Sequence, residues 1–240
     1  MVNRNLELCL SPALYHRFEN KEAIVVIIDV LRASSAICTA FSNGAVAIIP
    51  VADISRAKEY KNQGYLVAAE RDGFVLDFAD FGNSPFNFTH DKVNGKTIVY
   101  STTNCTRIID LTSSTYKTVI GTFINISALS DWLLVQGRDV ILLCAGWKDK
   151  VNLEDTICAG AIAERLLKDS VFSTICDSAK MALDLWRMAC KDPLNYIEKA
   201  AQRTRLRDKG LDDCIEYCMT QDRSRAIPVM QNGMLKNMAV

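Results

Sequence analysis

Charged and hydroxyl side chains follow an apolar run near the start of the chain. The segment VVIIDVLRASSAICTAF, residues 25–41, opens as a β-branched run and then presents Asp29, Arg32, Ser34 and Ser35. A buried strand gains nothing from ending in an aspartate, and a helix does not need an arginine at its start. Carboxylate oxygens suit a hard divalent cation, whereas arginine and serine donate hydrogen bonds to phosphate oxygens. These residue types indicate a site where a metal ion and an anion could meet.

Similar residue types recur further along the chain, mostly where an apolar run ends. They are Glu70, Arg71, Asn83, Ser84, Thr102, Thr103, Asn104, Arg107, Glu154 and Asp155. Two arginines at such positions could bind acidic groups of a substrate, and the hydroxyls with helix-start amides could hold a phosphate. The carboxylates could ligate a cation.

Each of these residues also has an ordinary structural interpretation. Asp29, the serines and the 102–104 stretch could cap helices, Arg32 could pair with a neighbouring acid, and Glu70 with Arg71 could form a surface pair. FGNSP, which contains Asn83 and Ser84, is typical of a turn. Glu154 and Asp155 could stabilise the first turn of a helix by about 0.3–1 kcal/mol. However, adjacent carboxylates repel each other, and a divalent cation would relieve that repulsion.

The elements that must position these residues alternate between strands and helices. Strands are predicted at 23–28, 45–51, 65–69, 96–101, 117–121 and 139–146, with a late strand at 226–230. Helices are predicted from 33 to about 42, 53 to about 64, 104 onward, 126–137 and 153–168, and 173–220 is almost wholly helical. The stretch 71–95 has no clear period. This alternation predicts an α/β fold of three layers, α/β/α, with a largely parallel or mixed sheet and a mostly helical C-terminal part.

Ligands of such sheets bind outside the carboxyl ends of the strands. The predicted strand ends carry Asp29 to Arg32, Glu70-Arg71, Ser101 to Asn104, and Gly146 shortly before Glu154. We therefore expect these residues to gather at one rim of the sheet. Residues 1–240 are interpreted as a single domain, because no linker, repeat or low-complexity tract divides them.

Composition narrows the class of protein. Lys and Arg total 28, as do Asp and Glu, so no global charge favours nucleic acid or an anionic membrane. No apolar stretch approaches the roughly 20 residues of a membrane span, and no signal peptide is recognised. Nine cysteines, mostly within apolar runs, indicate buried free thiols in a cytoplasmic protein rather than a disulfide framework. His16 and His90 are expected to be surface residues, and Cys214 and Cys218 are expected to share a helix face.

Four motifs that follow one another along the chain resemble those of the 2-phosphosulfolactate phosphatase family, the ComB-like proteins. They are DVLRASS, ERDGF…DFGNSP, STTNCTR and CAG…NLEDTICAGAIAERL, and they span Asp29 to Leu167 in order. The C-terminal helical part resembles the family only loosely. The resemblance implies a Mg²⁺-dependent α/β phosphatase that converts (R)-2-phospho-3-sulfolactate to 3-sulfolactate and phosphate, a step toward coenzyme M.

The resemblance also implies roles for the residues. Asp29, Glu70, Glu154 and Asp155 would bind the metal, with catalytic roles for Asp29, Arg32, Glu154 and Asp155. The substrate would contact Arg32, Ser34, Ser35, Arg71, Asn83, Ser84, Thr102, Thr103, Asn104 and Arg107. Two positions depart from the family pattern: Asp72 stands in place of the first residue of a glycine pair, and Cys105 replaces a glycine.

Several other phosphatase and nucleotide-binding motifs are absent from the sequence. It has no C-x5-R loop, no Arg-His-Gly triplet and no G-x4-G-K-[ST] loop, and Leu31 occupies the place of the second acid in an Asp-x-Asp pair. Metal-assisted hydrolysis of a small anionic phosphorylated substrate is what remains. Whether Asp29 would be a ligand or a nucleophile is open.

Two alternatives are also open: a phosphatase for another phosphorylated hydroxy or sugar acid, or a non-catalytic anion-binding protein. A homodimer is expected only from the general frequency of self-association among soluble enzymes.

Overall fold

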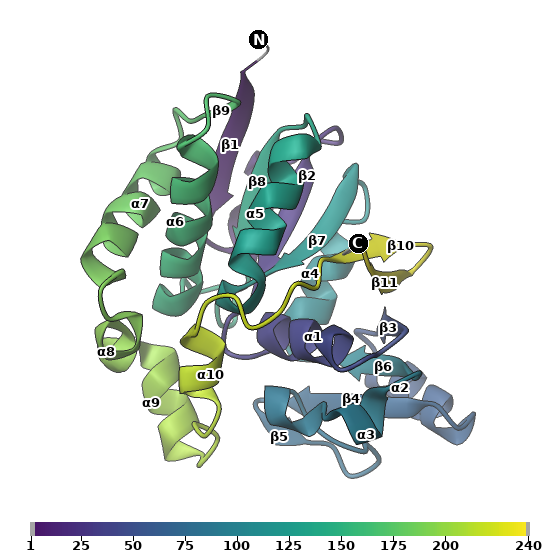
Figure 1. Cartoon of the computed structure of the whole chain (residues 1–240). Coiled ribbons are helices and arrows are strands. Elements are labelled where there is room, and N and C mark those ends of the chain that lie inside the picture. Colours follow the sequence, from purple (N-terminus) through teal and green to yellow (C-terminus); the bar gives the residue numbers. More distant parts are fainter. Residues whose placement is uncertain (1–2, 239–240) are drawn as a thin grey trace.

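The computed structural model describes residues 3–238, and a single mixed sheet of eleven strands runs through it (Figure 1). The strands are β1 (Arg4–Cys9), β2 (Ile24–Ile28), β3 (Ala47–Pro50), β4 (Leu66–Arg71), β5 (Phe74–Val75), β6 (Thr97–Ser101), β7 (Lys117–Gly121), β8 (Val140–Cys144), β9 (Phe172–Ser173), β10 (Pro228–Gln231) and β11 (Met234–Asn237). Their order across the sheet is β5-β4-β6-β3-β11-β10-β7-β2-β8-β1-β9.

The sheet consists of two parallel blocks joined by an antiparallel hairpin. β4, β6 and β3 form one block, and β7, β2, β8, β1 and β9 form the other. The β10–β11 hairpin separates them through three antiparallel pairings, which include Leu235 with Ile48 and Val229 with Val119. Because an odd number of antiparallel pairings reverses the direction, the two blocks run in opposite senses.

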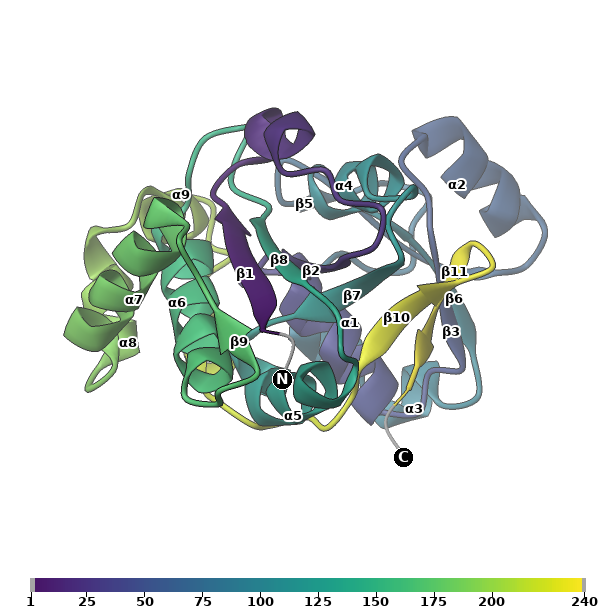
Figure 2. The same cartoon turned by 90° about the horizontal axis from the view of Figure 1, so that it is seen from above.

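Helices cover both faces of the sheet. They are α1 (Ala33–Ser42), α2 (Ile54–Asn62), α3 (His90–Val93), α4 (Cys105–Leu111), α5 (Ile126–Val135), α6 (Leu153–Leu167), α7 (Asp177–Ala189), α8 (Pro193–Tyr196), α9 (Ala201–Asp208) and α10 (Ile215–Met219), with 3₁₀ turns η1 (Pro12–Arg17), η2 (Pro85–Asn87), η3 (Phe123–Asn125) and η4 (Ile197–Lys199). Seen from above, α5 and α1 lie on one side of the strands and α4 and α2 on the other (Figure 2). The three-layer α/β prediction is confirmed.

Strand β2 explains why the centre of the sheet is so well buried. Its five residues, IVVII, are all β-branched, and each is fully buried. Since successive side chains of a strand point to opposite faces, Ile24, Val26 and Ile28 enter one hydrophobic core and Val25 and Ile27 the other. This rigid strand ends immediately before Asp29 and so fixes the position of that residue.

The sequence predicted most elements of the fold but missed several strands, including the interior strand β11. The strand predicted at 117–121 is β7 with the same bounds, and Asp53 caps α2 through Ser55. Strands β1 and β11 were not predicted. In β1, Leu6 and Leu8 are buried while Glu7 is partly exposed, a period-2 pattern too short to distinguish from a loop. The irregular stretch 71–95 contains only the short elements β5, η2 and α3.

The cysteine prediction is confirmed, since all nine are free and seven of them are buried. Cys190 is exposed and Cys176 is partly exposed. Within residues 3–238, no helix has the length and apolar character that crossing a membrane requires.

Candidate active site

A small pocket lies where the carboxyl ends of both sheet blocks converge. Its volume is about 30 Å³, and its lining comprises Asp29, Leu31, Arg32, Glu70, Gly73, Asn83, Thr102, Thr103, Asn104, Gly146, Trp147, Gln202 and Leu206. Asp29 follows β2 and Gly146 follows β8 in one block, whereas Glu70 ends β4 and Thr102 follows β6 in the other. Seven of the predicted site residues are therefore brought together.

Asp29 caps the start of α1 and also lines the pocket. Its Oδ1 accepts a hydrogen bond from the Ala33 amide at 3.3 Å, and its own amide donates to Ser34 Oγ at 2.9 Å. Burial raises the pKa of the Asp29 carboxyl to about 7; the Glu70 charge adds to this, and the Arg32 charge opposes it. Asp29 thus accepts a hydrogen bond at the first residue of α1, although Arg32 is the N-cap residue, and its functional role stays a prediction.

Glu70 ties two loops together at the pocket. Its Oε2 accepts from the Gly73 amide at 2.6 Å, and its Oε1 accepts from the Thr103 amide at 2.8 Å. The side chain is only 3% exposed. Because two backbone amides already occupy its oxygens, Glu70 holds the 70–73 turn against the loop that follows β6.

Arg32 lines the pocket and forms no salt bridge within residues 3–238, although its charge acts on the nearby Asp29 carboxyl. It is 4% exposed, and its Nη2 donates to Asn83 Oδ1 at 2.8 Å while its Nη1 donates to the Leu211 carbonyl at 3.3 Å. Both acceptors are neutral, so they orient the guanidinium group without cancelling its charge. Such a group is suited to bind an anion in the pocket.

Glu154 and Asp155 begin α6 and are each 1% exposed. Asp155 accepts from the Val30 amide at 2.9 Å and from the Gly146 amide at 3.0 Å, so it joins the loops after β2 and β8. Neither oxygen of Glu154 has a hydrogen-bond partner from another residue. Burial raises the pKa of Glu154 to about 7, and the Asp29 carboxylate adds to the rise while Arg205 opposes it.

Other predicted site residues lie outside the pocket lining. Ser34 and Ser35 bond within the fold, Ser35 Oγ reaching the Val30 carbonyl at 2.9 Å. Arg71 donates to the Ala52 carbonyl and to Ser101 Oγ. Arg107 pairs with an exposed aspartate of the loop after β8. These residues, together with Ser84, Glu154 and Asp155, are absent from the pocket lining, and their functional roles stay predictions.

The two departures from the family pattern have different backbone consequences. Asp72 has φ +52° and Gly73 has φ +92°, so this turn needs the left-handed region that glycine adopts without strain. Asp72 is exposed there, and Asp is among the side chains that tolerate this conformation. Cys105, in contrast, is the first residue of α4 and fully buried. The turn before α4 therefore accommodates a side chain at this position.

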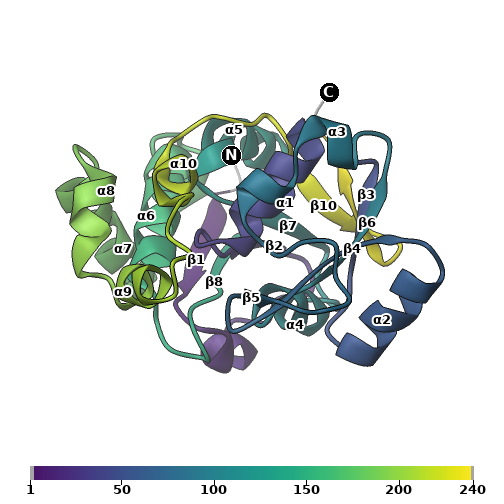
Figure 3. The same cartoon turned by 90° about the horizontal axis from the view of Figure 1, so that it is seen from below.

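The pocket also contains residues that the sequence interpretation missed. Trp147 follows Gly146 after β8, and Gln202 and Leu206 come from α9, in the C-terminal helical part. The Gln202 Nε2 donates to the Leu31 carbonyl at 3.1 Å and so attaches α9 to the loop after β2. Figure 3 shows α9 and β5 on either side of the end of β8. Helical spacing gave no sign that α9 would reach the site.

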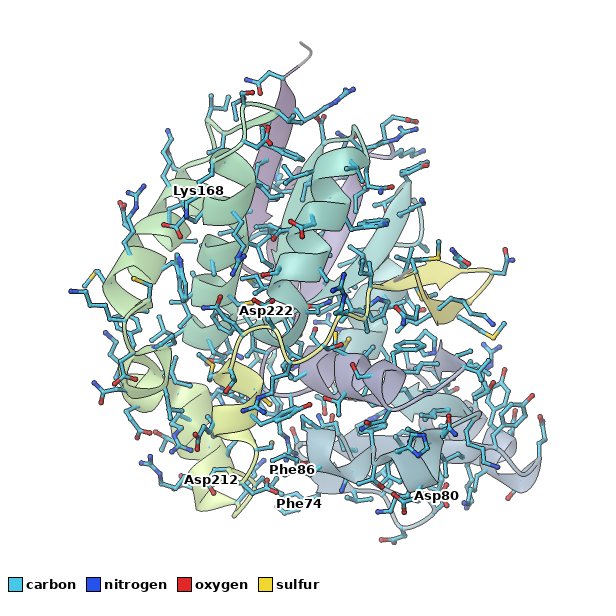
Figure 4. The ribbon with its side chains drawn as sticks, in the orientation of Figure 1. Phe74, Asp80, Phe86, Lys168, Asp212 and Asp222 are labelled. Atoms are coloured by element: carbon cyan, nitrogen blue, oxygen red, sulfur yellow. The ribbon has the colours of Figure 1, made fainter. Side chains whose placement is uncertain are left out.

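Aromatic contacts hold the C-terminal helices against the opposite edge of the sheet. Figure 4 labels Phe74 and Phe86 below the C-terminal helices. The Lys209 Nζ is 5.2 Å from the Phe74 ring centroid, and Phe86 meets Tyr217 edge to face at 5.5 Å. Within the 201–220 region, Gln202 and Leu206 of α9 form one side of the pocket.

The carboxylates of Asp29, in the pocket lining, and of the nearby Glu154 are the residues that could hold a divalent cation. No group of three or more His, Cys, Asp or Glu side chains within residues 3–238 is arranged to hold a metal ion. Mg²⁺, however, usually takes only one or two carboxylates and completes its coordination with water and substrate phosphate. A buried Glu154 carboxylate without partners, near an Asp29 whose pKa is raised, meets that requirement.

Comparison with known proteins gives a consistent result over nearly the whole chain. The family model described as 2-phosphosulpholactate phosphatase matches residues 9–233, which extends the similarity into the C-terminal helices. A protein of Thermotoga maritima is 37% identical over 210 residues, 87% of this chain and 89% of its own. Proteins of Caldanaerobacter subterraneus (32%, covering 90% of this chain and 91% of its own) and Clostridium tetani (32%, 97% and 100%) are also similar. All three are named probable 2-phosphosulfolactate phosphatase.

Proposed function

The chain belongs to the 2-phosphosulpholactate phosphatase family, a family of phosphoric monoester hydrolases, and on that premise we propose that it is a magnesium-dependent phosphatase. Its substrate would be (R)-2-phospho-3-sulfolactate, converted to 3-sulfolactate and phosphate as in coenzyme M biosynthesis. The supporting observation is the convergence of Asp29, Arg32 and Thr102 at one pocket, with the unpartnered Glu154 carboxylate beside Asp29. The nine free thiols favour a cytoplasmic setting.

Asp29 and Glu154 are the residues that would hold the metal. Each is buried, each has a raised pKa, and the two charges repel across the site. Mg²⁺ bound there would neutralise that repulsion, polarise the phosphoryl group and orient the attacking water. Glu70 and Asp155 act chiefly by fixing the loops that carry the other groups, because backbone amides already occupy their oxygens.

The remaining pocket groups would bind the phosphoryl oxygens. Arg32 offers a guanidinium group whose hydrogen bonds to Asn83 and Leu211 use neutral oxygens, and it would stabilise negative charge as the bond to the leaving oxygen breaks. Thr102 Oγ1 is buried without a hydrogen-bond partner and lines the pocket, so it is free to donate to the same oxygens. Hydrolysis forms one P–O bond to water and breaks the P–O bond to the 2-hydroxyl, which takes up a proton.

The decisive assay measures phosphate release from phosphosulfolactate and from a panel of other phosphomonoesters, with Mg²⁺ and with EDTA. Wild-type protein should release phosphate only with Mg²⁺. Asp29→Asn and Glu154→Gln should each lower kcat at least about 100-fold, because both are assigned to the metal. Glu164→Gln, on the outer part of the same helix α6, is the matched control and should keep full activity.

The other outcomes are informative. Equal metal-dependent turnover in wild type, Asp29→Asn and Glu154→Gln would refute the site. A preference for a different phosphorylated acid would keep the reaction and replace the substrate. Calorimetric titration with Mg²⁺ distinguishes a phosphatase from a non-catalytic anion-binding protein. The phosphatase should bind Mg²⁺, whereas an anion-binding protein does not need the carboxylates and should not bind it.

A further inference from the structure

A cluster of cations surrounds Trp147 at the outer edge of the pocket. The Arg205 guanidinium lies 5.1 Å from the Trp147 ring centroid, Lys148 Nζ lies 5.3 Å from it and Lys209 Nζ lies 5.8 Å from it. We call these four residues the Trp147 rim. They come from the loop after β8 and from the end of the C-terminal helix α9, two segments that the fold alone brings together.

The rim adjoins the pocket directly. A second hollow of about 20 Å³ is lined by Trp147, Gln202, Arg205, Leu206, Lys209, Asp72 and Gly73. Trp147, Gln202, Leu206 and Gly73 also line the pocket that contains Asp29 and Arg32. A ligand that fills the pocket would therefore reach the rim without crossing solvent-exposed protein surface.

The pocket is too small for more than one end of a phosphorylated acid. A single water needs about 10–15 Å³ of such volume, so about 30 Å³ suits only a few non-hydrogen atoms. With the phosphoryl group beside Arg32, the rest of the molecule must extend outward. The hollow at the Trp147 rim adjoins the pocket and is therefore the space into which the rest of the substrate would extend.

The rim carries more positive than negative charges. Lys148 pairs with the Asp72 carboxylate at 3.0 Å, whereas Lys209 donates to the Asp72 backbone carbonyl, which carries no charge. Arg205 is held by neutral oxygens, Gln202 Oε1 at 2.8 Å and Asn152 Oδ1 at 3.3 Å. These bonds use Nε and Nη2, and no residue within 3–238 accepts from its Nη1. Partial burial lowers the pKa of Arg205, and the negative charge of the nearby Glu154 opposes this effect.

We propose that Arg205, supported by Trp147 and Lys209, is a specificity-determining residue that binds the non-phosphate acid group of the substrate. A carboxylate or sulfonate at the rim accepts charge-assisted hydrogen bonds from Arg205, while Trp147 fixes the plane of the guanidinium group. The protein therefore selects phosphorylated acids over phosphomonoesters that carry no second charge. This inference rests on the proposed phosphatase function.

The test compares substrates with and without a second acid group. In Arg205→Met, kcat/KM for phosphosulfolactate and for phosphoglycolate should fall about 10- to 100-fold, as expected for loss of charge-assisted hydrogen bonds. For 4-nitrophenyl phosphate, which has no second charge, it should change less than about threefold. Phosphoglycolate carries only a carboxylate, so a larger fall with phosphosulfolactate would assign the rim to the sulfonate.

A matched control lies on the same helix. Arg207 points to Glu198, is half exposed and contacts neither hollow. Arg207→Met should leave all three kcat/KM values unchanged. Arg205→Lys should recover part of the loss, and thermal unfolding by circular dichroism shows whether each variant is folded.

Binding of 3-sulfolactate, measured by calorimetry, separates this inference from the proposed function. If the protein released no phosphate from any substrate, the phosphatase proposal would fail, whereas Arg205-dependent binding of 3-sulfolactate would still support the subsite. An equal loss in Arg205→Met for substrates with and without a second acid group would overturn the inference, because it would assign Arg205 to Glu154 or to the fold. Unchanged kcat/KM of Arg205→Met for all substrates would also overturn the inference. So would a wild-type protein that neither releases phosphate nor binds 3-sulfolactate.

Discussion

Glu154 and Asp155 are adjacent in the sequence and equally buried, yet Asp155 accepts two backbone hydrogen bonds and Glu154 accepts none from any other residue. One carboxylate is therefore part of the framework that joins the loops after β2 and β8. The other is a buried carboxyl whose oxygens accept no hydrogen bond from another residue within 3–238. The two residues should respond in opposite ways to substitution by their amides.

Glu154→Gln should stabilise the metal-free protein while it abolishes metal binding. At pH 8 the wild-type side chain is largely ionised and unpaired, and removal of such a charge is expected to raise the free energy of unfolding by about 1 kcal/mol or more. Urea unfolding in EDTA at pH 8 measures this, with Glu164→Gln as control. A lower unfolding free energy in Glu154→Gln would show that the carboxylate has a stabilising partner after all.

Asp155→Asn should have the opposite effect. The asparagine Oδ1 can accept from one of the two amides, but its Nδ2 would face the other N–H group. We expect a loss of about 1–3 kcal/mol in unfolding free energy, the cost of leaving a buried polar group unsatisfied. Asp110→Asn, at an exposed site on α4, should cost almost nothing in the same assay. Equal stability of Asp155→Asn and wild type would contradict the bridging role.

The stability of the metal-free protein should fall as the pH rises from 5.5 to 8.5. The carboxyls of Asp29 and Glu154 have folded-state pKa values raised to about 7, so their contribution is fully present below their unfolded values near 4 and is lost as the pH rises through 7. The nearby cations Arg32 and Arg205 reduce the rises without removing them. The loss in unfolding free energy should be about 2 kcal/mol or more.

Mg²⁺ should reverse this dependence. Its stabilising effect on the melting temperature is expected to be larger at pH 8.5 than at pH 5.5, because the ligands must be ionised to bind it. Melting curves at both pH values with Mg²⁺ or EDTA provide the measurement. A metal-induced shift that is greater at pH 5.5 would exclude Asp29 and Glu154 as ligands.

Gly160→Ala should destabilise the fold even though alanine favours helices by about 1 kcal/mol over glycine. A Cβ at position 160 in α6 would lie 2.1 Å from the Ala182 carbonyl oxygen of α7, so the two helices would have to move apart. We expect a net loss of about 1–3 kcal/mol, typical of overpacking. Thermal unfolding monitored by circular dichroism tests this. A stabilised Gly160→Ala protein would mean that α7 is not held at this distance.

The sequence by itself determined the central strands and the residues at their ends. The β-branched run at 24–28 has to be a buried strand, and Asp29 has to follow it, because these properties are local and periodic. The acids and hydroxyls at 70 and 102–104 were found for the same reason. Their roles in binding metal and substrate stay predictions.

Only the tertiary structure decided which of these residues meet. The two sheet blocks run in opposite senses across the β10–β11 hairpin, and yet the folded chain brings the Glu70 end of one block to the Asp29 end of the other. Helix α9 adds Gln202 and places Arg205 beside Trp147, a contact between residues 58 positions apart that no local pattern encodes. Such long-range packing depends on the shape of the whole core. For this reason Arg71 and Arg107, chosen by local pattern, lie outside the pocket lining, and Arg205, which lines the adjoining hollow, was missed.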